Sequence, residues 1–251
     1  MNTIFVHRDG RTEPVTSIDR GWLNPAAAGR GVYLWVDLAA PTIPEMLVLT
    51  DTFAFHRVAV EASRQPRQLP VIDAYDEYLF AAVAGADADI AFFVGAHFIV
   101  SVHWDESKAV AGLADSVRHG GKQFGEGPFA MFHRLVHATV EGFAPVLQKH
   151  AACVDGLETR LAGKATANLA GEVLRARRDV FDLRQRLSRE HDAVGRLAAR
   201  QRVDISSEMA VRFRDVQNQL ARLVDQALAV EDRLGALLSV AAALSAKKSW
   251  M

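Results

Sequence analysis

The chain is poor in cysteine, in net charge and in long apolar runs. Its single cysteine, Cys153, excludes an intramolecular disulfide or a cysteine-cluster metal site and is typical of a reducing compartment. The 29 basic and 30 acidic residues leave a net charge of −1, so no overall field favours nucleic acid or an anionic membrane. The longest uncharged apolar stretches, Ile90–Val102 and Leu234–Ala246, have 13 residues each. A membrane-spanning helix needs about 20, so we expect no span within this sequence.

Signals of secretion and of catalysis are also missing. The N-terminal segment MNTIFVHRDG lacks the apolar core of a signal peptide, so the expected start is cytosolic. The sequence has no glycine-rich phosphate loop, no Ser-His-Asp arrangement in a recognisable context and no Cys/His finger. We therefore do not expect an enzyme.

The first part of the chain predicts a mixture of strands and helices. Gly31–Leu38 is rich in β-branched and aromatic residues and predicts a buried strand. Thr42 and Glu45 have the spacing of a capping box and predict a short helix to about Phe53. A second helix is expected from His56 to Gln65-Pro66, because the residue before proline resists helical geometry.

Strand character returns after this second helix. Tyr78–Ala84 predicts one strand, and Ile90–Val94 and Phe98–His103 predict a hairpin around Gly95-Ala96-His97. These segments indicate a strand-rich sheet with helices packed on it.

From Pro128 onward the apolar spacing is that of helices. Phe129–Leu161 predicts one long helix that Pro145 should kink or break, because proline removes a backbone hydrogen bond. Glu172–Arg200 predicts a second long helix with one buried face and an arginine-rich, solvated face. Nucleic-acid binding there would require interleaved aromatic residues, so we expect none.

The last helix has the most regular pattern in the sequence. Its apolar residues alternate spacings of three and four over more than four heptads, as in a coiled-coil seam. They are Phe213, Val216, Leu220, Leu223, Ala227, Val230, Leu234, Leu237, Ala241 and Leu244. A helix this long cannot bury its seam alone. It needs either a neighbouring helix of the same chain or identical helices around a symmetry axis.

The expected fold class is therefore α+β. An αβα N-terminal domain with a mixed sheet (residues 1–127) precedes long antiparallel helices (128–202) and a very long C-terminal stalk helix (203–251).

Six groups of residues, in this order along the chain, resemble one known family. They are Trp35-Val36-Asp37-Leu38 with Pro41-Thr42 and Glu45, Phe55-His56 with Val58–Glu61, Arg67–Pro70 with Tyr75–Phe80, Phe92–Gly95 with Phe98–His103, Glu141-Gly142-Phe143 with Pro145-Val146-Leu147, and Phe213–Val216. Together they resemble the N-terminal cytosolic domain of CorA-like divalent-cation transporters, without the membrane helices. The resemblance implies an αβα body, a helical arm and a homopentamer around the stalk helices. It also implies passage of Mg2+, Co2+ or Ni2+ through a membrane part, with the cytosolic domain at the cytoplasmic face of the inner (plasma) membrane.

The sequence departs from the family pattern near its end. The Gly-Met-Asn signature is absent, and Leu237-Leu238-Ser239 lacks the acidic residue that relatives carry after the leucine pair. Lys247-Lys248-Ser249-Trp250 would suit the cytosolic edge of a membrane. The sequence is then either cut before the membrane part, which we favour, or a natural soluble relative.

The resemblance also suggests ion ligands, since hard divalent cations prefer carboxylate oxygens. By position, the stalk ligand is Asp215, and the ligand from the body is Asp87 or Asp89 in the loop Gly85–Asp89. The plainer interpretation is an exposed helix residue and two turn residues.

A second set of candidates lies on the first long helix. His133, His137 and Glu141 are spaced i, i+4, i+8 and share one face, and His137 falls where relatives place an acid. Histidine there would favour Co2+, Ni2+ or Zn2+ over Mg2+. Histidines packed under the sheet are the plainer alternative.

Three functions remain open from the sequence. The leading hypothesis is a cytosolic gating domain in which regulatory Mg2+, or Co2+, Ni2+ or Zn2+, bridges subunits and favours the closed state. The second is the corresponding domain of a zinc-transporting relative with the same fold. The third is a coiled-coil interaction protein that lost transport.

Overall fold

The computed structural model describes residues 2–24, 26–64, 69–120, 122–163, 168–200 and 205–248. Contacts within the chain divide it into two compact units. The body unit comprises Met1–Gly142 and Asp192–Gln217, and the helical unit comprises Phe143–His191 and Asn218–Met251. These two units are defined by spatial contacts, whereas the three predicted domains are consecutive segments of the sequence. The three-domain division therefore stays a prediction.

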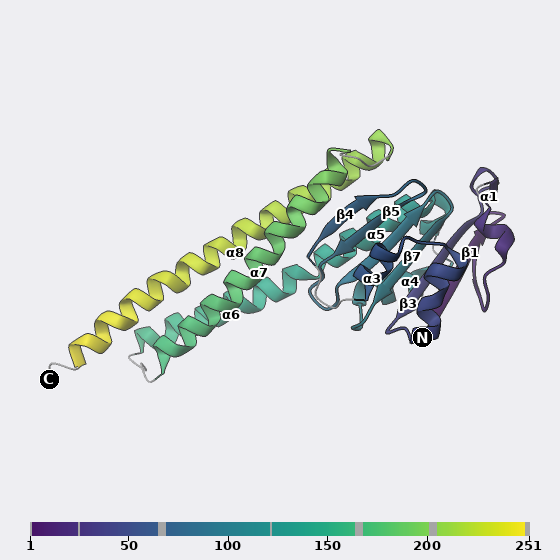
Figure 1. Ribbon diagram of the computed structural model, residues 1–251. Coiled ribbons are helices and arrows are strands. Elements are labelled where there is room, and N and C mark those ends of the chain that lie inside the picture. Colours follow the sequence, from purple (N-terminus) through teal and green to yellow (C-terminus); the bar gives the residue numbers. More distant parts are fainter. Residues whose placement is uncertain are drawn as a thin grey trace. The chain divides into compact units, whose positions relative to one another are not determined.

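A seven-stranded mixed sheet forms the centre of the body unit (Figure 1). Its order is β2-β1-β3-β7-β6-β5-β4. The strands are β1 (Asn2–Arg8), β2 (Arg11–Val15), β3 (Tyr33–Ala39), β4 (Val71–Ala74), β5 (Tyr78–Val83), β6 (Ile90–Gly95) and β7 (Phe98–His103). β3 and β7 pair in parallel, and all other neighbours are antiparallel. The mixed sheet confirms the predicted fold class.

Helices cover both faces of this sheet, which makes the body unit an αβα sandwich. On one face Leu34, Val36 and Leu38 of β3 pack with apolar residues of α2 (Ile43–Leu47), of the π-helical turn η2 (Val48–Thr52) and of α3 (Arg57–Ser63). On the other face α5 (Pro128–Glu141) contacts β3, β6 and β7, and α4 (Lys108–Arg118) packs against α5. Because both faces are covered, β3 is buried from Leu34 to Leu38.

Local signals in the sequence account for several of these elements. Glu45 accepts a hydrogen bond from the backbone N–H of Thr42 at 2.7 Å, which is one half of the predicted capping box. His56 is the N-cap of α3 and accepts from the backbone N–H of Val58. The predicted end of that helix, Gln65-Pro66, lies outside the described residues. β6 and β7 form the predicted hairpin.

Short helical segments complete the body unit. They are η1 (Arg20–Leu23), α1 (Ala26–Gly29) and η3 (Lys122–Glu126).

Two helices stand where the sequence predicted one long helix. α5 ends at Glu141 and α6 (Phe143–Ala162) begins two residues later, with Gly142 between them. Pro145 explains the break, because its ring clashes with the carbonyl of the residue four positions earlier, Glu141. Proline is tolerated near the start of α6, where an N–H has no helical partner.

The two remaining helices contribute residues to both units. They are α7 (Leu169–Ala198) and α8 (Ser207–Lys248), the latter 42 residues long. Ser206 sets the start of α8 by accepting a hydrogen bond from the backbone N–H of Met209 at 3.1 Å. Although α8 is long, none of the described helices is both long and apolar enough to cross a bilayer.

The predicted seam of α8 is buried within the single chain. Every seam residue from Phe213 to Ala241 is buried, and the side chain of Leu244 lies outside the described residues. The helical unit also buries residues of α6 (Leu147, Val154 and Leu157) and of α7 (Val180 and Leu187). Of the two ways to bury the seam, the chain therefore uses its own helices.

Candidate metal-ion site

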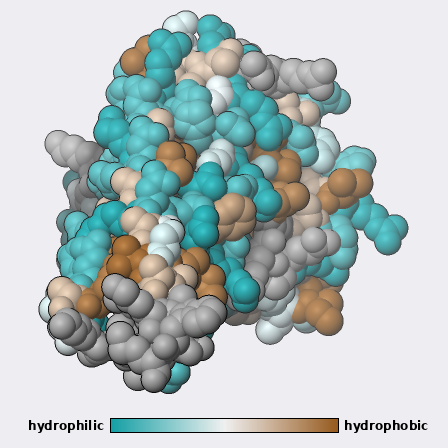
Figure 2. All heavy atoms as spheres, turned by 90° about the vertical axis from the view of Figure 1, so that its left-hand side faces the viewer, coloured by the Kyte–Doolittle hydropathy of each residue, from teal (hydrophilic) through white to brown (hydrophobic). Residues whose placement is uncertain are grey.

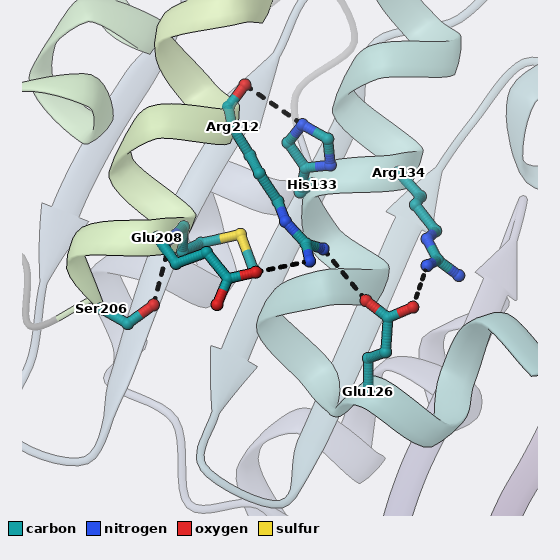
Figure 3. A network of polar contacts seen from close by, with 7 residues as sticks. Glu126, His133, Arg134, Ser206, Glu208 and Arg212 are labelled. Atoms are coloured by element: carbon teal, nitrogen blue, oxygen red, sulfur yellow. Dashed lines mark hydrogen bonds and ion pairs between the residues drawn. The ribbon is translucent and has the colours of Figure 1, made fainter.

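An ionic network joins α5, η3 and the first turns of α8 within the body unit (Figure 3). Glu126 lies between the guanidinium groups of Arg134 and Arg212, and Arg212 donates to it at 3.0 Å. Arg212 also donates to Glu208 at 2.8 Å. The hydrogen bond from Arg212, together with the charge of Arg134, lowers the pKa of Glu126 below its ordinary value. The carboxylate therefore stays charged and holds α8 against α5.

His133 lies directly beside this network. Its Nε2 is 3.3 Å from the backbone carbonyl oxygen of Arg212, as Figure 3 shows. A carbonyl only accepts, so Nε2 carries the proton and Nδ1 carries the lone pair. The ring also meets Phe213 edge-on, with centroids 5.3 Å apart. Burial lowers the pKa of His133, so the imidazole is neutral at pH 7.

His137 and Glu141 continue this line along α5. The rings of His133 and His137 are stacked with centroids 6.1 Å apart. The Nδ1 atom of His137 lies 3.6 Å from Oε2 of Glu141, and both side chains are about half exposed. The structure therefore brings His133, His137 and Glu141 together on one helix face, as their spacing predicts.

The predicted stalk ligand, Asp215, is exposed on α8 in the same unit, three residues after Arg212. Within the described parts of the chain, no three His, Cys, Asp or Glu side chains converge closely enough to hold an ion. One chain alone therefore presents candidate ligands but no complete site among these residues.

The loop carboxylates already bind backbone groups. Asp87 accepts from its neighbour Ala88 at 2.9 Å and from the backbone N–H of Lys108, the first residue of α4, also at 2.9 Å. Asp89 accepts from the N–H of Gly85 at 3.3 Å and closes the loop. A Cβ at Gly85 would lie 2.2 Å from the Ala88 carbonyl oxygen, so this turn needs glycine. These contacts match the turn interpretation, and the ligand role of Asp87 and Asp89 stays a prediction.

A buried polar cluster in the sheet escaped the sequence reasoning. Ser101 of β7 donates to Asp37 of β3 at 2.6 Å and accepts from the indole N–H of Trp35 at 3.1 Å. His103 lies 3.4 Å from Asp37, and its Nδ1 donates to the carbonyl oxygen of Asp105 at 2.7 Å. The only sequence signal was a charged residue, Asp37, inside an otherwise apolar strand.

The hydrogen bonds of this cluster join β3 to β7. Ser101 donates to the carboxylate and not to the imidazole, so the cluster lacks the serine–histidine bond of a nucleophilic triad. Burial alone would lower the pKa of His103, but Asp37 and the Asp105 carbonyl outweigh it and raise that pKa.

Solved structures of other proteins share the fold of this chain. The soluble domain of CorA from Methanocaldococcus jannaschii superposes with a TM-score of 0.79 at 13% identity, covering 96% of this chain and 97% of that one. The complete CorA structure from the same organism gives 0.81 at 12% identity, with 99% and 78% covered. The cytoplasmic domain of ZntB from Vibrio parahaemolyticus gives 0.79 at 8% identity, with 98% of each chain covered. At such identities the likeness concerns the fold.

Sequence comparison identifies the family. The model of the CorA-like Mg2+ transporter protein family matches residues 30–249, and the chain belongs to this family. YfjQ of Bacillus subtilis (strain 168), whose name describes a metal ion transporter, is 25% identical over 197 residues. That match covers 76% of this chain and 62% of the relative, so the chain spans less than two thirds of that protein's length.

Proposed function

We propose that the chain is the cytosolic ion-sensing and gating domain of a CorA-like Mg2+/Co2+ transporter. Divalent cations bridge subunits of a homopentamer and favour its closed state, and loss of the ions loosens the assembly. Its partners are other copies, its own membrane domain at the inner (plasma) membrane, and the cations, with Mg2+ as the regulatory ion and Co2+, Ni2+ or Zn2+ as alternatives. We propose no nucleic-acid partner.

One observation carries this proposal. Asp215, His137 and Glu141 reach solvent from α8 and α5 of the body unit, yet no group of three ligands forms within the described part of one chain. Such exposed, incomplete ligand sets are what a site shared between subunits requires, because a hard cation takes six or more oxygen ligands. The proposed ligand from the loop Gly85–Asp89 is Asp87 or Asp89.

The surface of α8 bears on the proposed assembly. Its heptad seam is already covered, so a homopentamer would have to use other faces of the helix. Apolar side chains also reach the surface (Figure 2). On α8 these include Val211, Leu228 and Val240. In the helical unit a groove of about 430 Å³, lined mainly by apolar atoms, runs between α6 and α8 past Leu147, Leu223 and Val230. These apolar surfaces support assembly through α8.

The test is the response of the chain to metal. Mg2+ or Co2+ should raise the melting temperature or shift the oligomer distribution, and Asp215→Ala should weaken the response at least severalfold. Asp225→Ala is the matched control, because Asp225 is equally exposed on α8 but lies in the helical unit. An unchanged melting temperature and oligomer distribution on adding Mg2+ and on chelating it would reject the proposal.

A second candidate is the corresponding domain of a zinc-transporting relative. His137 favours it, because imidazole nitrogen suits Zn2+ better than Mg2+. A response to Zn2+ with none to Mg2+ would select this candidate. A coiled-coil interaction protein that lost transport would respond to neither ion.

A further inference from the structure

We propose that His133 and His137 chelate one borderline divalent cation, Ni2+, Zn2+ or Co2+, within a single chain. This site deepens the proposed function by adding a second, softer ion specificity beside the carboxylate ligands. A regulatory role of the histidine site rests on the proposed gating function. Metal binding by the two histidines does not, because it requires no second subunit.

The first argument is the position of the two rings. Histidines one helical turn apart are a standard pair of ligands for these metals, as in helical zinc sites. The rings are already stacked, with an interplanar angle of 29°. Metal–nitrogen distances of about 2.0–2.1 Å place two ligand nitrogens roughly 3 Å apart. Chelation requires the His137 ring, which is 42% exposed, to turn so that its lone pair meets that of His133, whose ring packs on Phe213.

The second argument is the proton on each ring. Metal-binding histidines usually donate their other N–H to a carbonyl or carboxylate, which fixes the tautomer and orients the ring. His133 has this arrangement, with Nε2–H toward the Arg212 carbonyl and the Nδ1 lone pair available. For His137 the Glu141 carboxylate lies 3.6 Å from Nδ1, beyond hydrogen-bond distance, so Nε2 faces no partner from Glu141. Glu141 therefore acts on this site through its charge.

The third argument is electrostatic. Two guanidinium groups near His133, those of Arg134 and Arg212, would repel a cation if they were unpaired. Both are paired with Glu126, and Arg212 is paired with Glu208 as well. Glu141 adds a negative charge at the open end of the pair. This pairing offsets part of the repulsion between the two guanidinium groups and a cation.

The chemistry predicts the order of affinity. Two imidazoles without a third protein ligand hold a metal weakly, so water completes the coordination and we expect a Kd in the micromolar range. Affinity should follow Ni2+ above Co2+, with Zn2+ binding as well, and Mg2+ should not bind here because it demands oxygen ligands.

The test is calorimetric titration of the untagged chain with Ni2+ at pH 7.5. The chain should bind one equivalent, and His137→Gln should weaken binding at least tenfold. His119→Gln is the matched control, because His119 is an exposed histidine next to a carboxylate, Asp115, and should leave the affinity unchanged. Glu141→Gln should weaken Ni2+ binding severalfold and leave the melting temperature of the metal-free chain unchanged, which a merely structural role would not produce.

His133→Gln should also weaken Ni2+ binding at least tenfold. Because that ring packs on Phe213, circular dichroism checks its fold, and the exposed His137 variant decides the question if this variant does not fold. Unchanged Ni2+ affinity in His137→Gln, or equal loss in His119→Gln, would overturn the site. Mg2+ titrations of the same variants separate the two proposals: an Asp215-dependent Mg2+ response without Ni2+ binding rejects only the histidine site, and the converse rejects only the gating function.

Discussion

The body unit and the helical unit are held together in different ways. The body unit buries large aromatic side chains on both faces of a sheet and encloses a polar cluster around Asp37. The helical unit packs aliphatic side chains along one seam and joins its helices by ion pairs. These pairs include Arg160–Glu172, the largely buried Arg184–Glu231, and Arg233 with Asp155 and Glu158.

Charge also separates the two units. The body unit carries 16 basic and 21 acidic residues, and the helical unit carries 13 basic and 9 acidic. The net charge of the whole chain is therefore close to zero although the body unit is acidic and the helical unit is basic. All candidate ligands lie in the acidic unit, whose field raises the local concentration of cations. The acidic unit is therefore the one to examine for the proposed ion binding.

The largest expected effect comes from Phe213→Ala, which removes a fully buried ring of α8 from the body unit. Phe213 packs on Phe132 and His133, so the change should cost about 3–5 kcal/mol of unfolding free energy. Hydrogen exchange should accelerate in the sheet more than in α6. Phe181→Ala, at a ring 42% exposed in the helical unit, is the control and should cost under about 1 kcal/mol. Equal acceleration in both units would contradict the division.

Leu234→Ala tests the same helix in the other unit. The side chain is fully buried in the seam, and its truncation should cost about 2–4 kcal/mol and accelerate exchange in α6 and α7 first. The control is Leu228→Ala, because Leu228 is on α8 but 44% exposed. If both substitutions had the same effect, burial of the seam would not stabilise the unit.

His103→Gln tests the buried polar cluster, which belongs to the body unit. Losing a partner of Asp37 should cost about 1–3 kcal/mol. The pKa of His103 is raised in the folded state, so its stabilising contribution is full below about pH 6.5 and is lost as pH rises through the folded-state value. Denaturant unfolding should therefore show a larger cost at pH 6 than at pH 9. A cost that is independent of pH would contradict the charged pair.

The smallest effect is expected for Arg233→Gln in the helical unit. Arg233 donates to Asp155 at 2.6 Å and to Glu158 at 2.7 Å, but it is 38% exposed and screened by solvent. The cost should be below about 1 kcal/mol and should vanish near 1 M salt, where the Debye length is about 3 Å. Arg222→Gln, at an exposed arginine of the same helix, is the control. A cost that persists in high salt would indicate packing by the side-chain stem.

Local patterns predicted much of the fold. The capping box at Thr42, the β6–β7 hairpin and the seam of α8 each depend on residues close together in the sequence, and the structure contains all three. The β1–β2 hairpin was missed although its signal is present. Asp9-Gly10 forms the turn, with positive φ at both residues (52° and 72°), which is the usual Asp-Gly hairpin signal.

Long-range relations were beyond this reasoning. The parallel pairing of β3 with β7 joins residues more than 60 positions apart, and no local pattern specifies it. Asp87 was one of two loop acids, with Asp89, predicted as an ion ligand, but it also binds the first backbone N–H of α4, that of Lys108, 21 residues away. The helix face shared by His133, His137 and Glu141 followed from spacing alone. The Arg212 carbonyl that sets the His133 tautomer comes from a helix 79 residues later, so the sequence could not supply it.

The continuity of α8 has a consequence for biosynthesis. The helix follows α5, α6 and α7 in the chain, yet Phe213 completes the core of the body unit and the residues from Leu220 onward complete that of the helical unit. Neither unit can close its core while the ribosome is still translating the earlier parts, at about 5–20 residues per second. Apolar faces of α5, α6 and α7 stay open during that interval, which leaves them prone to non-specific association until α8 emerges.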